Sequence, residues 1–358
     1  MTQKLTGGKL YPFVLLLSLT ITFLFIIACE DKKPNEPEEP EPGRRDYEWT
    51  VDTLIAPFWS AERIWGSSPE DVWVIGGGGS SQEQVWHYDG DSWKLSNSIF
   101  RSSPHSIFGL NREDAWMGGS EGRIWHFEGL GWHENYQYIK ENSRSVEIAD
   151  IYGAAADNIY AVGVVFIGNE EIKRAFILHY DGKTWNEVFY ADSNSYFVRL
   201  YPIKGTKEFY IYDIKLETVN TNEQFVIQRF DGKEVKEIYN LDLVNFGSWA
   251  GLYSVGQDVY YTRGKEVGIF SNDKFNKLYD IEDPRFNYAI WGDRSNNVFI
   301  SMWDGIYHYN GTDFSYIYYF PYWETALSDF QMFDDTIFFI GRHSRKFENY
   351  VFKGTQKK

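Results

Sequence analysis

The amino-acid sequence predicts an all-β fold built from one repeated four-stranded unit, because two kinds of short hairpin recur along the chain in a fixed order. The second hairpin of each unit is clearest from Val85 to Trp93. There an alternating run leads into Asp89-Gly90, a pair that favours a type I′ turn, and an aromatic residue follows. The chain also contains 26 Tyr and 27 Phe among its 358 residues, and aromatic side chains favour pleated strands over helices.

Close copies of this hairpin occur in three other places, and a weaker copy occurs in a fourth. The close copies share an apolar or aromatic strand, an acidic or amide residue before Gly, and an aromatic residue three positions after it, whereas the weaker copy has Val235 at that last position. The copies turn at Gly129, Gly182, Gly232 and Gly311, and further turns are expected near Asp273 and at Gly354. Histidine occupies one strand position in four of the units, at His87, His126, His179 and His308.

The first hairpin of each unit is clearest from Ile64 to Gly76, with its turn at Ser67 to Asp71. Equivalent hairpins begin at Ile107, Ile151 and Ile290, and weaker ones at Leu200, Leu252 and Asp329. Two hairpins make four strands, and a four-stranded unit repeating every 40 to 50 residues is typical of a β-propeller blade. The sequence therefore predicts a seven-bladed β-propeller of four-stranded antiparallel blades.

One aromatic residue recurs in the first strand of every unit, and we expect it to pack between neighbouring blades. These residues are Trp65, Phe108, Tyr152, Tyr201, Tyr253, Trp291 and Phe330. The repeated histidines are likewise expected to lie against the next blade.

The two ends of the repeat region predict how the ring closes. The last unit stops at Tyr350 to Gly354 without a fourth strand, whereas Tyr47 to Val51 precedes the first unit without a hairpin partner. We expect the N-terminal strand to complete the last blade, because this pairing would remove an exposed sheet edge.

Two short motifs resemble those of known propeller families. Strands that end in paired glycines, at Gly76 and Gly118, followed by Tyr-Asp and then Trp, resemble Kelch repeats. The turn from Asp181 to Trp185 is similar to the Asp-box of sialidase-type (BNR) propellers, although it lacks the residue between Asp and Gly. The resemblance covers about residues 46–354. It implies a propeller similar to those of secreted bacterial lipoproteins.

The N-terminal residues resemble a bacterial lipoprotein signal peptide. Lys4 and Lys9 precede an apolar run that ends in a lipobox-like sequence, Ile-Ile-Ala-Cys, at Cys29. We expect a signal peptide at 1–28 and a lipid anchor on Cys29. An uncleaved membrane-spanning helix is the alternative. Either reading puts the remainder outside the cytoplasm, in the cell envelope, and we expect the outer membrane, on its periplasmic or surface side.

The composition of the rest of the chain predicts a tether followed by a folded domain, and its net charge argues against some classes of partner. Residues 29–45 comprise Cys29 and a stretch rich in Pro and Glu, which predicts a solvated tether, and 46–358 form the propeller domain. Acidic residues outnumber basic ones 51 to 35, for a net charge of −16. This balance argues against nucleic acid and anionic membrane surfaces as partners. The single cysteine excludes an internal disulfide.

The connections between strands predict the binding face. The turns within each hairpin are short, whereas the connections at the opposite rim are longer and rich in aromatic residues. We expect Trp59, Tyr138, Trp249 and Trp323 to bind a ligand there, because exposed aromatic rings stack on sugars and anchor protein interfaces. The alternative is that these rings fold back over the edge of the core.

The sequence contains no recognised catalytic set and no cofactor motif. It lacks a Gly-x-Ser-x-Gly elbow and a phosphate-binding loop, and the four repeated histidines lie in different blades, so we expect no metal site among them. The predicted function is recognition of a polysaccharide or an envelope protein without catalysis. Two alternatives stay open: a scaffold subunit of an envelope assembly, and a carbohydrate-active enzyme that uses two carboxylates.

Overall fold

The computed structural model describes residues 41–56, 59–168, 172–216, 223–242, 250–321, 325–343, 346 and 348–358. Residues Pro42–Lys358 form one compact unit. Every regular element in the described residues is a β-strand, and no helix there is long and apolar enough to cross a membrane. The predicted signal peptide, Cys29 and most of the tether lie outside the described residues.

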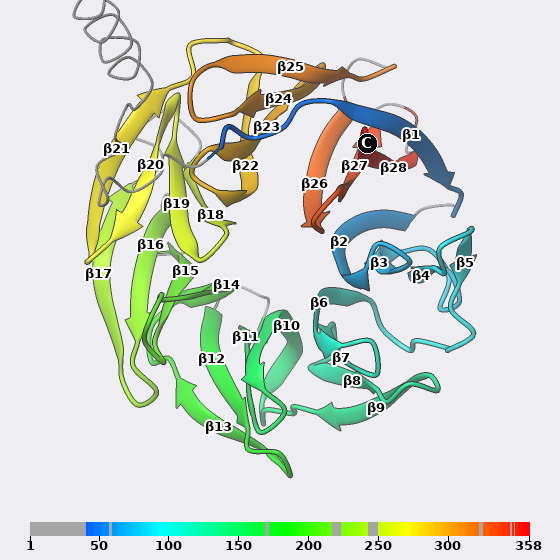
Figure 1. Cartoon of the computed structure of the whole chain (residues 1–358). Helices are drawn as coiled ribbons and strands as arrows, with labels where there is room; N and C mark the ends of the chain where they lie inside the picture. Colours follow the sequence, from blue (N-terminus) through cyan, green and yellow to red (C-terminus); the bar gives the residue numbers. More distant parts are fainter. Residues whose placement is uncertain are drawn as a thin grey trace, which may run out of the picture. The chain divides into compact units, whose positions relative to one another are not determined.

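The strands follow one another in sets of four that lie around a common centre (Figure 1). The first set is β2 (Trp59–Ser68), β3 (Asp71–Gly78), β4 (Val85–Tyr88) and β5 (Trp93–Leu95). The second is β6 (Pro104–Asn111), β7 (Asp114–Gly119), β8 (Arg123–Phe127) and β9 (Trp132–Gln137). The third is β10 (Ser143–Ala155), β11 (Asn158–Ile167), β12 (Ile172–Tyr180) and β13 (Trp185–Tyr190). The fourth is β14 (Ser195–Pro202), β15 (Phe209–Leu216), β16 (Glu223–Phe230) and β17 (Val235–Asp242).

The remaining strands follow the same plan. The fifth set is β18 (Ala250–Val255), β19 (Asp258–Arg263), β20 (Glu266–Ser271) and β21 (Lys274–Asp280). The sixth is β22 (Phe286–Arg294), β23 (Asn297–Met302), β24 (Gly305–Tyr309) and β25 (Phe314–Tyr319). The last set joins β26 (Thr325–Met332), β27 (Thr336–His343) and β28 (Asn349–Gln356) to β1 (Tyr47–Leu54).

Each set is an antiparallel meander whose first strand lies innermost in Figure 1. The fifth and sixth sets are joined into one eight-stranded sheet by a single parallel pair, Val255 with Gly292. In the last set β1 pairs antiparallel with β28 from Tyr47↔Gln356 to Leu54↔Asn349. A strand from one end of the chain therefore completes a sheet made at the other end.

The apolar core lies between consecutive sets. Each buried cluster of the described residues joins two neighbours; one of them, for example, links the second and third sets through Trp116, Ile148 and Phe176. Another links the last set to the first through Phe338 and Val74. Alternating strands present apolar side chains on both faces of each sheet, so each sheet packs against one neighbour on either side.

The aromatic residues of the innermost strands pack at these contacts, as expected. Trp65 lies in the cluster between the first and second sets. A Cβ on Gly109 of the second set would come within 2.2 Å of the Trp65 ring. The Gly that follows the aromatic residue in several units thus makes room for the ring of the preceding set.

The last set departs from the predicted alignment by one residue. Trp65 pairs with Trp73 in the first set, and the matching pair in the last set is Gln331 with Phe338. Gln331 therefore occupies the repeated position, and Phe330 packs toward the sixth set instead. Because side chains alternate along a strand, a shift of one residue exchanges the two faces.

Each repeated histidine packs on an aromatic residue of its own sheet, on the face that this sheet turns toward the next set. His87 stacks on Trp73, directly opposite on the adjacent strand, with ring centroids 3.9 Å apart. Its Nε2 lies 2.7 Å from Asp71 Oδ1. The other three pair in the same way: His126 with Asp114, His179 with Asn158 and His308 with Asn297. Opposed side chains of paired strands share one face, and Trp73 packs against the second set, so His87 lies on that face as well.

The last residues of the predicted tether contact the sixth set. Gly43 donates its N–H to the carbonyl of Asn296 at 3.0 Å, and Arg45 donates to His308 Nδ1 at 3.2 Å. One predicted turn is corrected. Gly354 was expected at a turn, but it lies inside β28 opposite Trp49. No turn is needed there because β1 supplies the fourth strand.

Candidate functional site

Two of the four predicted binding aromatics are buried. Trp59, at the start of β2, is 0% exposed, and Tyr138, just after β9, is 5% exposed. The Tyr138 ring packs on Phe176 with centroids 4.6 Å apart, and its hydroxyl donates to Glu187. The expectation of exposed rings is wrong for these two positions, because both fold over the core edge. Trp249 and Trp323 lie outside the described residues.

Three charged side chains converge where the innermost strands of the first three sets begin. His105 of β6 places Nδ1 3.0 Å from Glu62 Oε2 on β2. Its Nε2 lies 2.8 Å from the Ser120 hydroxyl and 3.4 Å from Glu147 Oε1 on β10. The side chains of Glu62, His105 and Glu147 are 34%, 19% and 27% exposed, so solvent reaches all three. We call these three residues the opening cluster.

Electrostatics favour a protonated imidazole in the opening cluster. Burial alone would lower the pKa of His105, but the hydrogen bond that Glu62 accepts from it and the charges of Glu62 and Glu147 outweigh burial, and the pKa is raised. Nearby, burial and the charge of Glu147 raise the pKa of Tyr196, whose phenol therefore stays protonated. The protonated imidazole of His105 lies between the carboxylates of Glu62 and Glu147. The remaining lone pairs of these carboxylates can accept hydrogen bonds from a ligand.

Position within the repeat explains why these residues meet. Glu62 and His105 each stand three residues before the repeated aromatic of their strand, Trp65 and Phe108, so both lie at the same height on adjacent innermost strands. Neither residue belongs to a recognisable motif of the repeat. Alignment of the units would have shown charged residues at a position where other units carry small or apolar ones.

A second charged group lies farther along the innermost strands, two residues before the position of the repeated aromatic, which is Tyr152 in the third set and Gln331 in the last. Asp150 accepts a hydrogen bond from the Leu200 N–H of the next set at 2.9 Å. Asp329 accepts one from the Ile64 N–H at 3.1 Å, and its other oxygen lies 3.7 Å from Arg199 Nη2. Burial raises the pKa of Asp150, although the charge of Arg199 opposes the shift. These carboxylates tie neighbouring innermost strands together.

A cavity of 470 Å³ opens at the other end of the innermost strands. Its lining includes the charged residues Asp150 and Arg199 and the aromatic residues Phe108 and Tyr152. The hairpin turns contribute its rim, including Lys204 and Gln257. This end carries the short turns, opposite to the predicted binding face.

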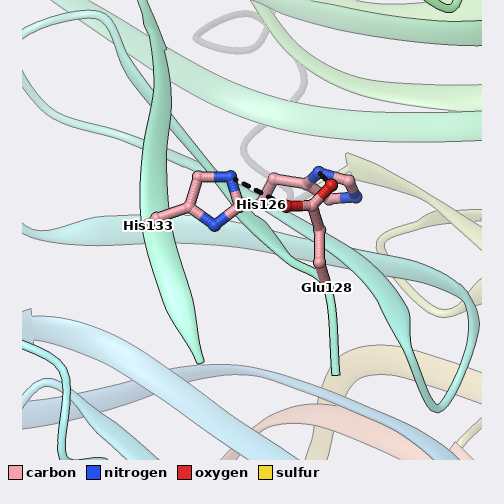
Figure 2. A group of neighbouring side chains, drawn as sticks. All are labelled: His126, Glu128 and His133. Atoms are coloured by element: carbon pink, nitrogen blue, oxygen red, sulfur yellow. Dashed lines mark ion pairs between the residues drawn. The ribbon is translucent and has the colours of Figure 1, made fainter. Parts of the chain in front are cut away.

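One group of side chains has the composition and spacing of a metal site in the described part of the chain. His126, Glu128 and His133 place their ligand atoms within 4.8 Å of one another (Figure 2). The sequence pattern groups His126 only with the equivalent histidines of other units, which lie in different blades. Its neighbours in the same hairpin, Glu128 and His133, were missed because the repeat does not contain them elsewhere.

Comparison with known proteins identifies the fold. No protein-family model matches the chain, and no curated protein matches it in sequence. A catalytically inactive variant of virginiamycin B lyase from Staphylococcus aureus, solved with quinupristin, has a TM-score of 0.62 at 13% identity over 87% of this chain and 100% of that one.

Two further structures are similar to this chain. YCF48 bound to D1 peptide has a TM-score of 0.59 at 10% identity, over 89% of this chain and 100% of that chain. The WD40 β-propeller domain of Doa1 has a TM-score of 0.56 at 11% identity, over 87% and 98%. At these identities the likeness shows the fold alone: the described part of this chain is a β-propeller.

Proposed function

We propose that this chain is a seven-bladed propeller, closed by its N-terminal strand, that acts as a non-catalytic recognition module in the cell envelope. The pairing of β1 with β28 and the hydrogen bond from Ile64 N–H to Asp329 support a closed ring. The lipobox-like sequence supports a lipid anchor at Cys29, which would hold the module at the outer membrane.

The opening cluster is the observation that carries this proposal. Three separate strands bring Glu62, His105 and Glu147 to one solvent-accessible place at the rim of the longer connections. Two carboxylates face one imidazole, so the cluster is rich in hydrogen-bond acceptors. The connections at this rim differ in length from unit to unit, whereas the strands of the sheets are regular. This combination is typical of a recognition surface.

Acceptor-rich sites select ligands that carry hydroxyl or amino groups. Saccharides and peptides both do. Among proteins with this fold, YCF48 has been solved with a bound peptide. For this chain we propose a saccharide or peptide ligand, and a stable protein partner would indicate the scaffold role.

Binding should be tested with a glycan array and an envelope pulldown, using matched variants from the two ends of the ring. We expect Glu62→Gln and Glu147→Gln to weaken binding by about tenfold or more, since charge-assisted hydrogen bonds contribute about 1.5–3 kcal/mol. The controls Lys204→Ala and Gln257→Ala at the cavity rim should leave it unchanged. If the controls weaken binding and the opening variants do not, the ligand occupies the cavity instead.

A second candidate is hydrolysis, favoured by one geometric observation. The Ser120 hydroxyl, the His105 imidazole and the Glu62 carboxylate form a chain of contacts of 2.8 and 3.0 Å, the order of groups in a serine hydrolase triad. Against it, the N–H groups of Ser120 and Gly122 are bonded to the carbonyls of Ser103 and Val146. Neither is available to stabilise an oxyanion.

One labelling experiment distinguishes recognition from hydrolysis. A fluorophosphonate probe labels an activated serine, so labelling of the protein that is lost in Ser120→Ala would establish hydrolase chemistry. Recognition without catalysis predicts no labelling of Ser120, together with ligand binding that Ser120→Ala leaves within about twofold.

A further inference from the structure

We infer that the hairpin of β8 and β9 is a binding site for a divalent transition-metal ion of the zinc class, held by His126, Glu128 and His133. His126 and His133 are directly opposed in the register of the two strands, with ring centroids 5.7 Å apart. Glu128 stands in the turn between them, and Figure 2 shows its carboxylate between the two imidazoles. Imidazole and carboxylate are ligands that zinc accepts.

The distances suit a shared ion. Glu128 Oε1 lies 3.7 Å from His126 Nδ1, and Oε2 lies 3.5 Å from His133 Nε2. Metal–ligand bonds of about 2.0–2.1 Å place tetrahedral ligands about 3.3–3.4 Å apart, so small rotations of the exposed Glu128 and His133 side chains would complete the geometry. Water would occupy the fourth position.

One ligand is already oriented as metal-binding histidines are. His126 Nε2 lies 2.8 Å from Asp114 Oδ1, and the imidazole stacks on Trp116 with centroids 3.8 Å apart. Asp114 also accepts the Trp116 indole N–H at 2.9 Å. A carboxylate on one nitrogen fixes the tautomer that leaves the lone pair of the other nitrogen free, here Nδ1, for a metal.

The other units show that this combination is special to the second set. At the position of Glu128 the first set has Asp89, whose Oδ1 accepts the N–H groups of Asp91 and Ser92 in its own turn. Glu128 makes no such turn bond among the described residues, and its longer side chain reaches the imidazoles. Opposite His87 the first set has Lys94, whose ammonium contacts Asp89. That hairpin therefore has the repeat histidine and an acid but no second imidazole.

The site is on the outer part of its sheet and is accessible. The side chains of Glu128 and His133 are 66% and 47% exposed, whereas that of His126 is 14% exposed. The neighbouring turn residue Leu130 is fully exposed. An ion can enter without opening the core, and it would tie the two strands of the hairpin together at their turn.

The test is equilibrium dialysis of the full chain, stripped with a chelator, against Zn²⁺, with Co²⁺ absorption spectra to report tetrahedral nitrogen and oxygen ligation. We expect one ion per chain. His133→Lys, which copies the first set, should remove it, and Asp114→Asn should weaken binding by about 10–100-fold, as loss of an orienting carboxylate does. The amide in that variant can keep the fold, since Asn158 holds His179 in the same way.

The first set supplies a matched gain-of-function control. Lys94→His combined with Asp89→Glu rebuilds the three ligands around His87 and should raise the stoichiometry to two ions per chain. Zn²⁺ should also raise the thermal midpoint of the natural protein and not that of His133→Lys, because binding to the folded state stabilises it. Absence of binding by the natural protein, or equal binding by His133→Lys, would overturn the assignment.

Discussion

Removal of the Leu54 side chain should destabilise the whole propeller, because this residue fastens the N-terminal strand into the core. Leu54 is 2% exposed and lies in the cluster that contains Val74 of the first set and Phe338 and Val351 of the last. It therefore lies in the cluster that joins the first set to the last. A buried Leu→Ala change costs about 2–5 kcal/mol through lost transfer energy and the cavity left behind.

The same strand provides the control. Val51 is 37% exposed and pairs with Phe352 on β28, so it shares the backbone pairing of Leu54 without its burial. Val51→Ala should change the free energy of unfolding by no more than about 0.5 kcal/mol. A third variant, Gly354→Ala, should be intermediate, since its Cβ would lie 3.0 Å from the Trp49 ring and 3.1 Å from Ile337, where overpacking costs about 1–3 kcal/mol.

Chemical denaturation followed by tryptophan fluorescence measures all three variants. We expect Leu54→Ala to lower the midpoint strongly in a single cooperative transition, because an opened ring exposes two sheet faces at once. If Leu54→Ala and Val51→Ala unfold at the same denaturant concentration, the N-terminal strand does not hold the ring closed.

Three further predictions follow from single residues. Asp329→Ala should lower the free energy of unfolding by about 1–3 kcal/mol, because it leaves the Ile64 N–H without its acceptor and removes an ion-pair partner of Arg199; a denaturant titration measures it. Burial lowers the pKa of His308 from 6.5 to about 3, so between these pH values the unfolded chain binds a proton that the folded chain does not. Stability should therefore fall as pH drops from 6.5 to 3, by on the order of 5 kcal/mol, and the fall should be smaller in His308→Gln. Cys29→Ala should abolish labelling by a fatty-acid analogue, and unchanged labelling would refute the lipid anchor.

The repeat could be predicted because its signals are local. A turn such as Asp89-Gly90 depends on the backbone preferences of two residues, and alternation needs only the few residues of one strand. The strand positions of His87 and Trp65 could be predicted for the same reason. Their partners could not, since which side chains meet an imidazole depends on how strands pair and pack.

The candidate sites show the opposite case. Trp59 and Tyr138 stand in connections that the sequence marks as aromatic and variable, yet both rings are buried. Burial at the end of a strand depends on how the chain folds back over the neighbouring set, and no local pattern encodes that. The opening cluster could not be predicted from the sequence for a related reason. Glu62 and Glu147 are 85 positions apart in the chain, and they come together only because their innermost strands lie on either side of His105.

The sequence by itself determined that this protein is a chain of β-hairpins in four-stranded units, because turn chemistry, alternation and repeat spacing act over a few residues at a time. Tertiary structure alone decided which units pack together and which strand pairs with β1. It also decided that Gln331 takes the position expected for Phe330, and which charged side chains lie close to one another. These outcomes depend on strand register and on packing between sheets. Both are settled by contacts between residues far apart in the chain, where a shift of one residue exchanges the buried face for the exposed one.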